Sequence, residues 1–199
     1  MEINDSSRKV LLVLFKEFSE EQTITSLAKA VKMTRPGVFK IVKSLEREKL
    51  VVMSAIGKGK TSTSTVRLQR DHPLLEKLFS LFLASEANDY VRWQNTFKPI
   101  ENFTDFVIIF GSILHSPKEA NDIDILCISE KEKFLGLERS LHEIRKAELR
   151  MIHAVQFTPN EFKNELKNRN PAFIDAIRKG VVLFGHERFI SFMEELNTK

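Results

Sequence analysis

The stretch VIIFGSILHSPKEANDIDIL, residues 107–126, carries the pattern on which the fold assignment depends. An apolar run ends at Gly111 and Ser112, and after nine residues Asp122 and Asp124 open a second apolar run. Because successive side chains of a strand point to opposite faces, both aspartates are expected on one face, with the intervening isoleucine in the core. The pattern predicts two buried strands that place the Gly-Ser turn opposite a pair of carboxylates.

The paired aspartates point to a cation site. Two carboxylates side by side repel each other unless a divalent cation holds them, and hard oxygen ligands suit Mg²⁺ that bridges to nucleotide phosphates. A glycine lets a phosphate approach the backbone, and a serine offers a hydroxyl and an amide proton. We therefore predict that Asp122 and Asp124 are catalytic and hold Mg²⁺. Gly111 and Ser112 are predicted to bind a nucleoside triphosphate (NTP) as substrate or ligand. The alternative is two solvated aspartates that merely open a strand.

This constellation resembles the minimal nucleotidyltransferases of the polymerase-β superfamily, whose signature is Gly-Ser, a short spacer and Asp-x-Asp. The resemblance covers roughly residues 103–185, including the closing stretch GVVLFG at 180–185. It implies transfer of a nucleoside monophosphate from Mg-NTP to a hydroxyl acceptor. Relatives of this type are often paired with small helical toxins, so the resemblance also implies a toxin-type protein partner.

The chain departs from that family at two points. Leu114-His115-Ser116 replaces the run of a small residue, arginine and glycine that follows Gly-Ser in the family. The third carboxylate, which active members supply from a later strand, is missing from residues 149–157, where His153 or Gln156 takes its place. That group commonly acts as a base and as a ligand of a second metal. The sequence therefore leaves the enzyme assignment open. The alternative is a non-enzymatic transcriptional regulator whose degenerate nucleotidyltransferase domain binds nucleotide or a protein partner.

The rest of the second half alternates between helix and strand patterns. The predicted elements are a strand over 105–110, a strand over 122–128, a helix over 133–147, a strand over 149–157, two helices up to 179, a strand over 181–184 and a terminal helix. Residues 103–199 are therefore predicted to form a nucleotidyltransferase-like α/β domain with a small mixed sheet.

The first 72 residues follow a different order. Three short amphipathic helices are predicted, over residues 6–18, after Thr23 or Thr25, and after Thr34, and a hairpin follows over 50–56 and 61–68. This is the order of a winged helix-turn-helix, and residues 25–51 resemble that family. We predict a winged helix-turn-helix DNA-binding domain over 1–72 and a helical linker over 73–102, which makes the whole chain α+β.

The third helix is expected to present a basic face. Its apolar residues point inward, and a helix with a cationic outer face fits the major groove, while basic residues at a hairpin tip meet phosphates. The predicted contacts to double-stranded DNA are Arg35, Lys40, Lys43, Arg47, Lys58 and Lys60. The alternatives are a solvated cationic face and a winged helix that binds protein. Operator-binding domains of this kind usually act as dimers, so a homodimer is a further expectation.

Charge and composition narrow the class of protein. Residues 1–72 hold 14 Lys and Arg against 8 Asp and Glu, a net charge of +6, whereas the remainder holds 17 against 19, a net charge of −2. The basic part is expected to face a polyanion. The apolar runs are too short to cross a bilayer, the N-terminus lacks a signal-peptide pattern, and the single cysteine cannot build a disulfide framework or a cysteine metal site. We therefore expect a cytoplasmic, prokaryotic-type protein without a membrane partner.

Overall fold

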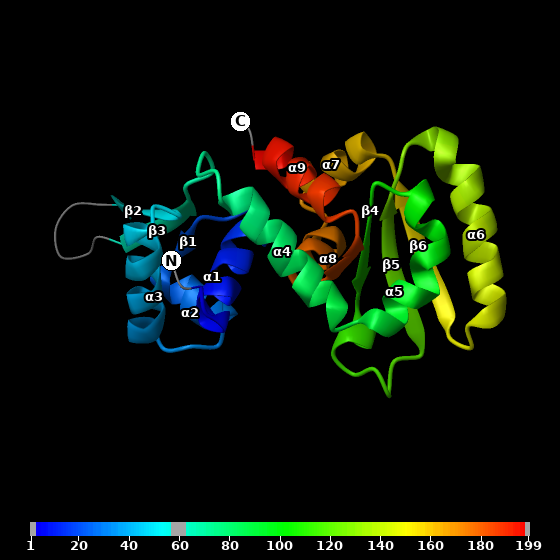
Figure 1. The fold of residues 1–199 in the computed structure, drawn as a ribbon, viewed down its shortest axis with the longest axis horizontal. Coiled ribbons are helices and arrows are strands. Elements are labelled where there is room, and N and C mark those ends of the chain that lie inside the picture. Colours follow the sequence, from blue (N-terminus) through cyan, green and yellow to red (C-terminus); the bar gives the residue numbers. More distant parts are fainter. Residues whose placement is uncertain (1–2, 57–62, 198–199) are drawn as a thin grey trace. The chain divides into compact units, whose positions relative to one another are not determined.

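The computed structural model describes residues 3–56 and 63–197 and divides into two compact units, Met1–Phe82 and Leu83–Lys199 (Figure 1). Each unit combines helices with a small sheet, so the α+β class expected from the sequence is confirmed. Within the described ranges, no helix has both the length and the apolar character needed to cross a membrane.

The first unit consists of three helices followed by a hairpin. Its elements are α1 (Asp5–Lys16), β1 (Gln22–Thr23), α2 (Ile24–Ala30), α3 (Arg35–Arg47), β2 (Val51–Ile56) and β3 (Thr63–Leu68). The strands form an antiparallel sheet in the order β1-β3-β2, in which β2 and β3 are the two strands of the wing. This arrangement is a winged helix-turn-helix, as the order of the sequence patterns predicts. The sequence patterns did not predict the short strand β1, which pairs with β3.

Local sequence explains where the two helices of the helix-turn-helix begin. Thr23 caps α2 in a reciprocal pair, because its Oγ1 accepts from the Ser26 amide at 3.1 Å and the Ser26 Oγ accepts from the Thr23 amide at 2.8 Å. Thr34 caps α3 by accepting from the Gly37 amide at 3.3 Å. Pro36 lies in the first turn of α3, where its missing amide proton leaves no helical bond unmade.

Helix α4 (Leu75–Asn88) contributes to both units because the division falls within it. In the first unit, Phe79 stacks on Phe15 of α1 with ring centroids 4.3 Å apart. The chain that follows α4 belongs to the core of the second unit, where Trp93 is buried. Most of the segment 73–102 is helical, and apolar side chains near its two ends are buried in the cores of the two units. The predicted bounds of the DNA-binding domain, the linker and the nucleotidyltransferase-like domain stay predictions.

The second unit is built on a mixed sheet with the strand order β6-β5-β4-β7. Its elements are α5 (Val91–Phe97), η1 (Lys98–Phe103), β4 (Phe106–Phe110), η2 (Ser112–Leu114), β5 (Asp122–Ile128), η3 (Lys131–Lys133), α6 (Phe134–Ala147), β6 (Met151–Phe157), α7 (Pro159–Lys167), α8 (Pro171–Lys179), β7 (Val181–Phe184) and α9 (His186–Asn197). Strands β5 and β6 run parallel, and the other two pairs are antiparallel. The small mixed sheet is as predicted, whereas the nucleotidyltransferase identity of the domain stays a prediction.

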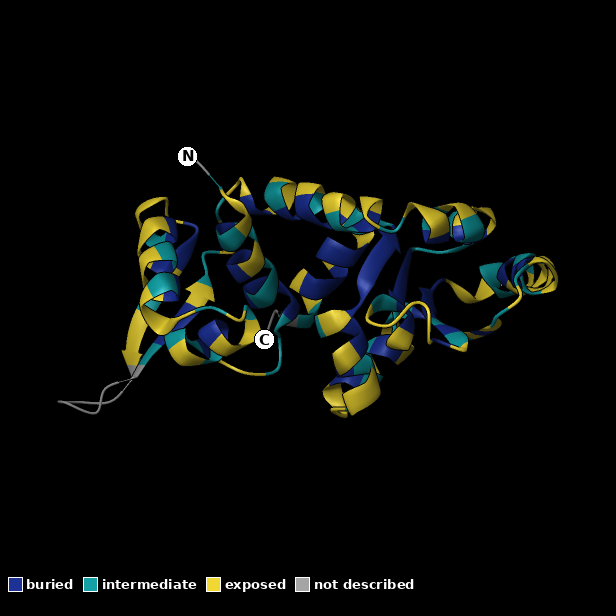
Figure 2. Ribbon diagram, turned by 90° about the horizontal axis from the view of Figure 1, so that it is seen from below, coloured by how far each residue is buried: buried dark blue, intermediate teal, exposed yellow. Residues whose placement is uncertain are grey.

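Helices cover both faces of this sheet. On one face, Val107 of β4 lies in a core with Leu137 and other apolar residues of α5, η1 and α6. On the opposite face, Phe106 contacts aromatic rings of α7 and α9, with the centroids of Phe106 and Phe189 5.3 Å apart. Strands β4, β5 and β7 are mostly buried, whereas most residues of the edge strand β6 are partly or fully exposed. Figure 2 shows the helices with alternating buried and exposed stripes. The sheet is thus a rigid central layer that can hold side chains in fixed positions.

Candidate functional site

Asp122 and Asp124 lie at the start of β5 and point to the same side of the sheet. Ile123 and Ile125 are fully buried in the core shared with α6, so the aspartates face the other side. The side chains of Asp122 and Asp124 are 39% and 28% exposed. The alternation predicted from the sequence is therefore confirmed, and both carboxylates are open to solvent.

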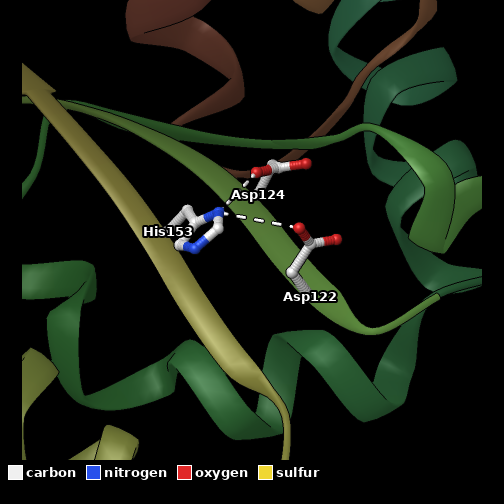
Figure 3. A group of neighbouring side chains, drawn as sticks. All are labelled: Asp122, Asp124 and His153. Carbon is white, nitrogen blue, oxygen red and sulfur yellow. Dashed lines mark ion pairs between the residues drawn. The ribbon is translucent and has the colours of Figure 1, made fainter.

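His153 joins the two aspartates from the neighbouring strand. Strands β5 and β6 are parallel in a register that pairs Asp124 with His153. The Nδ1 atom of His153 lies 3.5 Å from Oδ1 of Asp124 and 3.7 Å from Oδ2 of Asp122 (Figure 3). One ligand atom of each residue lies within 4.8 Å of the other two. We refer to Asp122, Asp124 and His153 as the Asp-Asp-His cluster.

The sequence left both His153 and Gln156 open as the residue that replaces a third carboxylate. The side-chain amide of Gln156 donates to Oε2 of Glu138 at 2.6 Å, on the α6 side of the sheet. His153 is on the side of the aspartates. Among the residues that the structure describes, no further aspartate or glutamate joins the cluster. The strand register therefore selects His153.

Gly111 lies directly beside Asp124, where β4 ends and η2 begins. Its backbone has φ +83° and ψ −160°, a region that glycine adopts without the strain a side chain would cause. A Cβ at this position would overlap Oδ2 of Asp124 and would lie 3.4 Å from its Cγ. Ser112 follows as the exposed first residue of η2. The structure thus brings the Gly-Ser turn to the aspartates, and the roles of these four residues in binding or catalysis stay predictions.

The electrostatics of the cluster favour a cation. Partial burial and the charge of Asp122 raise the pKa of Asp124, and His153 opposes that shift. A raised carboxyl pKa means that the folded protein disfavours the ionised form of the group. A positive ion between the two carboxylates would remove this penalty.

The donor set fits a divalent cation, but it fits the expected Mg²⁺ only in part. Mg²⁺ prefers a nearly ideal octahedron of oxygen ligands, whereas imidazole nitrogen suits transition metals such as zinc. Two carboxylates are enough to hold one cation that carries phosphate. The third position offers nitrogen instead of oxygen, and a second Mg²⁺ finds no further carboxylate there within the described ranges.

The first unit holds the other candidate site, on the outer face of α3. Val38, Val42 and Leu45 are buried on the inner face of this helix. The predicted DNA contacts on the helix are all exposed: Arg35, Lys40, Lys43 and Arg47. Lys58 and Lys60 lie outside the described residues. The basic outer face of α3 predicted from the sequence is therefore present, and its contact with DNA stays a prediction.

Lys43 has a neighbour that the sequence analysis did not assign. Its Nζ lies 2.7 Å from Oε2 of Glu46, and Oε1 of Glu46 accepts from the Met53 amide of β2 at 3.3 Å. Glu46 thus ties α3 to the wing. An exposed ion pair of this kind contributes about 0–1 kcal/mol, so Lys43 can exchange Glu46 for a phosphate at little cost.

A hollow of about 540 Å³ opens beside the first turns of α3. It is lined by β1, the start of α2, the start of α3 and the two wing strands: Thr23, Ile24, Thr25, Arg35, Pro36, Phe39, Met53 and Ser64. Phe39, which falls outside the apolar stripe of α3, is 44% exposed there. The sequence gives no signal for this hollow because its lining comes from five separate elements, β1, α2, α3, β2 and β3.

The chain was compared with protein families, with curated proteins and with solved structures. No protein-family model matches the chain, and no curated protein is significantly similar to it. Among solved structures, the chain is similar to MepR, a transcription regulator of the Staphylococcus aureus multidrug efflux pump MepA. The two chains share 23% sequence identity, and the TM-score of the superposition is 0.36. The similarity covers 47% of this chain and 66% of MepR, which is just under two thirds of that protein.

Proposed function

We propose that this chain is a DNA-binding regulator, which reads duplex DNA with α3 and carries a ligand site for a metal-bound nucleotide in the second unit. The observation that carries the proposal is the exposed basic face of α3 in a winged helix-turn-helix. The recognition helix of such a fold enters the major groove and places its N-terminal residues nearest the base edges. Arg35, at the first helical position, is the residue best placed to read a base.

The more C-terminal basic residues of α3 suit phosphates. Lys40 and Arg47 are exposed. They lie seven positions apart, hence about two helical turns along the same side. Contacts of this kind position the protein on DNA without reading sequence, and each contributes to the salt dependence of binding. We expect a homodimer whose two α3 helices occupy successive major grooves, about 34 Å apart.

The test is the salt dependence of binding to a labelled duplex, followed by fluorescence anisotropy. For B-DNA, the slope of log K against log salt changes by about 0.9 for each phosphate contact. The double variant Lys40→Ala, Arg47→Ala should therefore lower the slope by about 1.8. The control is Lys146→Ala, Lys179→Ala, which removes the same charge from two exposed ion-paired lysines of the second unit. Equal slopes for the two double variants, or no duplex binding at low salt, would refute DNA reading by α3.

The nucleotide part of the proposal is supported by the approach of Gly111 to Asp124. Asp122 and Asp124 would hold a divalent cation that neutralises the triphosphate, while Gly111 and Ser112 would contact its oxygens. This is the non-enzymatic alternative of the sequence analysis. Nucleotidyl transfer stays a prediction from the family resemblance, because His153, and no third carboxylate among the described residues, lies beside the two aspartates.

Nucleotide binding and transfer are tested separately. An NTP with Mg²⁺ or Mn²⁺ should raise the melting temperature of the full chain more than either component alone, through binding to the folded state. Asp124→Asn should abolish that increment, and Asp175→Asn, which changes an exposed carboxylate of α8, should not. Equal increments for both variants would remove the aspartates from the site. Incubation with a labelled NTP and protein or tRNA acceptors then decides whether transfer occurs.

A further inference from the structure

We propose that the Asp-Asp-His cluster is a site for one first-row transition-metal ion of the Co²⁺ or Zn²⁺ type, with His153 as a direct ligand, and that it selects such an ion over Mg²⁺. This inference deepens the nucleotide part of the proposed function, since it concerns the ion that would carry the nucleotide. It needs no nucleotide for its own test.

The spacing of the three donor atoms is close to what one metal ion requires. The Nδ1 of His153 is 3.5 Å from a carboxylate oxygen of Asp124 and 3.7 Å from one of Asp122. Metal–ligand distances of about 2.1 Å place neighbouring ligands of a tetrahedral ion about 3.4 Å apart. The oxygens of Asp122 and Asp124 lie within 4.8 Å of each other, so rotation of the side chains is needed to bring all three donors around one ion.

The orientation of the imidazole supports a metal ligand. The Nε2 of His153 lies 2.9 Å from Sδ of Met151, and a thioether sulfur can only accept. With the proton of a neutral ring on Nε2, Nδ1 presents a lone pair to an ion held by the two carboxylates, whereas without an ion a proton on Nδ1 can donate to Asp124. A cation bound among the three atoms would take the place of that proton and would be coordinated by Nδ1 and both carboxylates.

The chemistry of the donors determines the kind of ion. Imidazole suits zinc, iron, copper and nickel, whereas Mg²⁺ takes oxygen and keeps several waters. Three protein ligands leave a coordination position open. Because the side chain of His153 is 49% exposed, an ion and a further oxygen ligand can both reach the site from solvent.

The test is a titration of the full chain, freed of metal with a chelator, with Co²⁺, Zn²⁺ and Mg²⁺ in turn. Isothermal calorimetry should give one Co²⁺ or Zn²⁺ per chain, with a Kd at least about 100-fold below that of Mg²⁺. The visible absorption of bound Co²⁺ supplies a second readout of its ligands. His153→Ala should weaken Co²⁺ binding by at least the roughly 10–100-fold that loss of an outer partner of a metal ligand costs.

Two variants separate this inference from its rivals. His153→Asp creates an all-oxygen donor set and should strengthen Mg²⁺ binding while it weakens the preference for Co²⁺. His142→Ala, which removes an exposed histidine of α6, should leave both affinities unchanged. Circular dichroism checks the fold of each variant. If His153→Ala does not fold, His153→Gln replaces it, because glutamine is a polar side chain of similar length.

The inference is overturned if the wild type takes up no Co²⁺ or Zn²⁺ at one ion per chain, if Mg²⁺ binds as tightly as either, or if His142→Ala weakens Co²⁺ binding as much as His153→Ala. None of these results affects DNA binding, which belongs to the first unit. If a nucleotide stabilises the chain in the presence of Mg²⁺ but not of Co²⁺ or Zn²⁺, the proposed nucleotide site stands and only the choice of ion is refuted.

Discussion

Replacing Gly111 by alanine should destabilise the second unit and disturb its candidate site at once. The backbone of Gly111 has φ +83° and ψ −160°, and a residue with a Cβ held there costs about 1–3 kcal/mol. The new methyl group would also overlap the carboxylate of Asp124, which must then rotate away. Alanine restricts the unfolded chain more than glycine does, which returns about 0.4–1 kcal/mol. The net loss in unfolding free energy should be about 1–3 kcal/mol.

The chain offers a convenient probe for this loss. Trp93 is the single tryptophan, and it is buried in the core of the second unit. Its fluorescence during urea denaturation therefore follows that unit. At a slope of about 1–3 kcal/mol per molar urea, Gly111→Ala should lower the midpoint by about 1 M.

Two further variants separate the contributions. Gly37→Ala is the control, because Gly37 lies in the first unit and a Cβ there would meet Oγ1 of Thr34 at 3.1 Å without a positive φ. It should leave the Trp93 transition in place. Adding Asp124→Ala to Gly111→Ala should recover the part of the lost unfolding free energy that comes from overlap with the Asp124 carboxylate. The part that comes from the strained backbone of residue 111 should remain. A midpoint for Gly111→Ala within error of the wild type would refute the reasoning.

Three other predictions concern the same unit. Thr158→Ala removes the cap of α7, in which Oγ1 of Thr158 accepts from the Glu161 amide at 3.3 Å. The unfolding free energy followed by Trp93 should fall by about 1 kcal/mol, whereas Thr158→Ser should retain most of the stabilisation by the cap. Asp124→Asn in the presence of chelator should raise the unfolding free energy at neutral pH, because the pKa of Asp124 is raised in the folded state and its ionisation therefore opposes folding. This gain should shrink as the pH falls through the folded pKa and vanish below the ordinary carboxyl value; a gain that persists in acid would contradict it. Burial raises the pKa of Cys127 to about 12, so a thiol reagent at pH 8 should modify the chain only after denaturant is added, and rapid labelling of the native protein would show that the strand opens.

Short-range patterns in the sequence predict most of the local structure. The capping residues Thr23 and Thr34 and the apolar spacing of α3 determine a helix-turn-helix because they act over one or two turns. The alternation around Ile123 likewise places both aspartates on one face, since the period of a strand is a property of the backbone. Such short-range patterns were enough to predict that Asp122 and Asp124 lie on the same face of their strand and that the basic residues of α3 are exposed.

The assignment of residues 73–102 as a linker stays a prediction, because helical periodicity does not say which core a helix completes. Only the tertiary structure buries Phe79 in the first unit and Trp93 in the second. Short strand β1 was missed for a related reason, because its two residues form a strand only by pairing with β3.

The composition of the candidate metal site was decided by the register between β5 and β6. Gln156 and His153 stand three positions apart on one strand, so they face opposite sides of the sheet, and the sequence cannot say which side meets the aspartates. The parallel pairing of Asp124 with His153 resolves this, and it brings a nitrogen ligand to two carboxylates that lie 29 and 31 residues earlier in the chain. Side chains so far apart in sequence meet only through the hydrogen bonds of the sheet. This is why the sequence predicted the carboxylate pair but narrowed its partner on β6 only to His153 or Gln156.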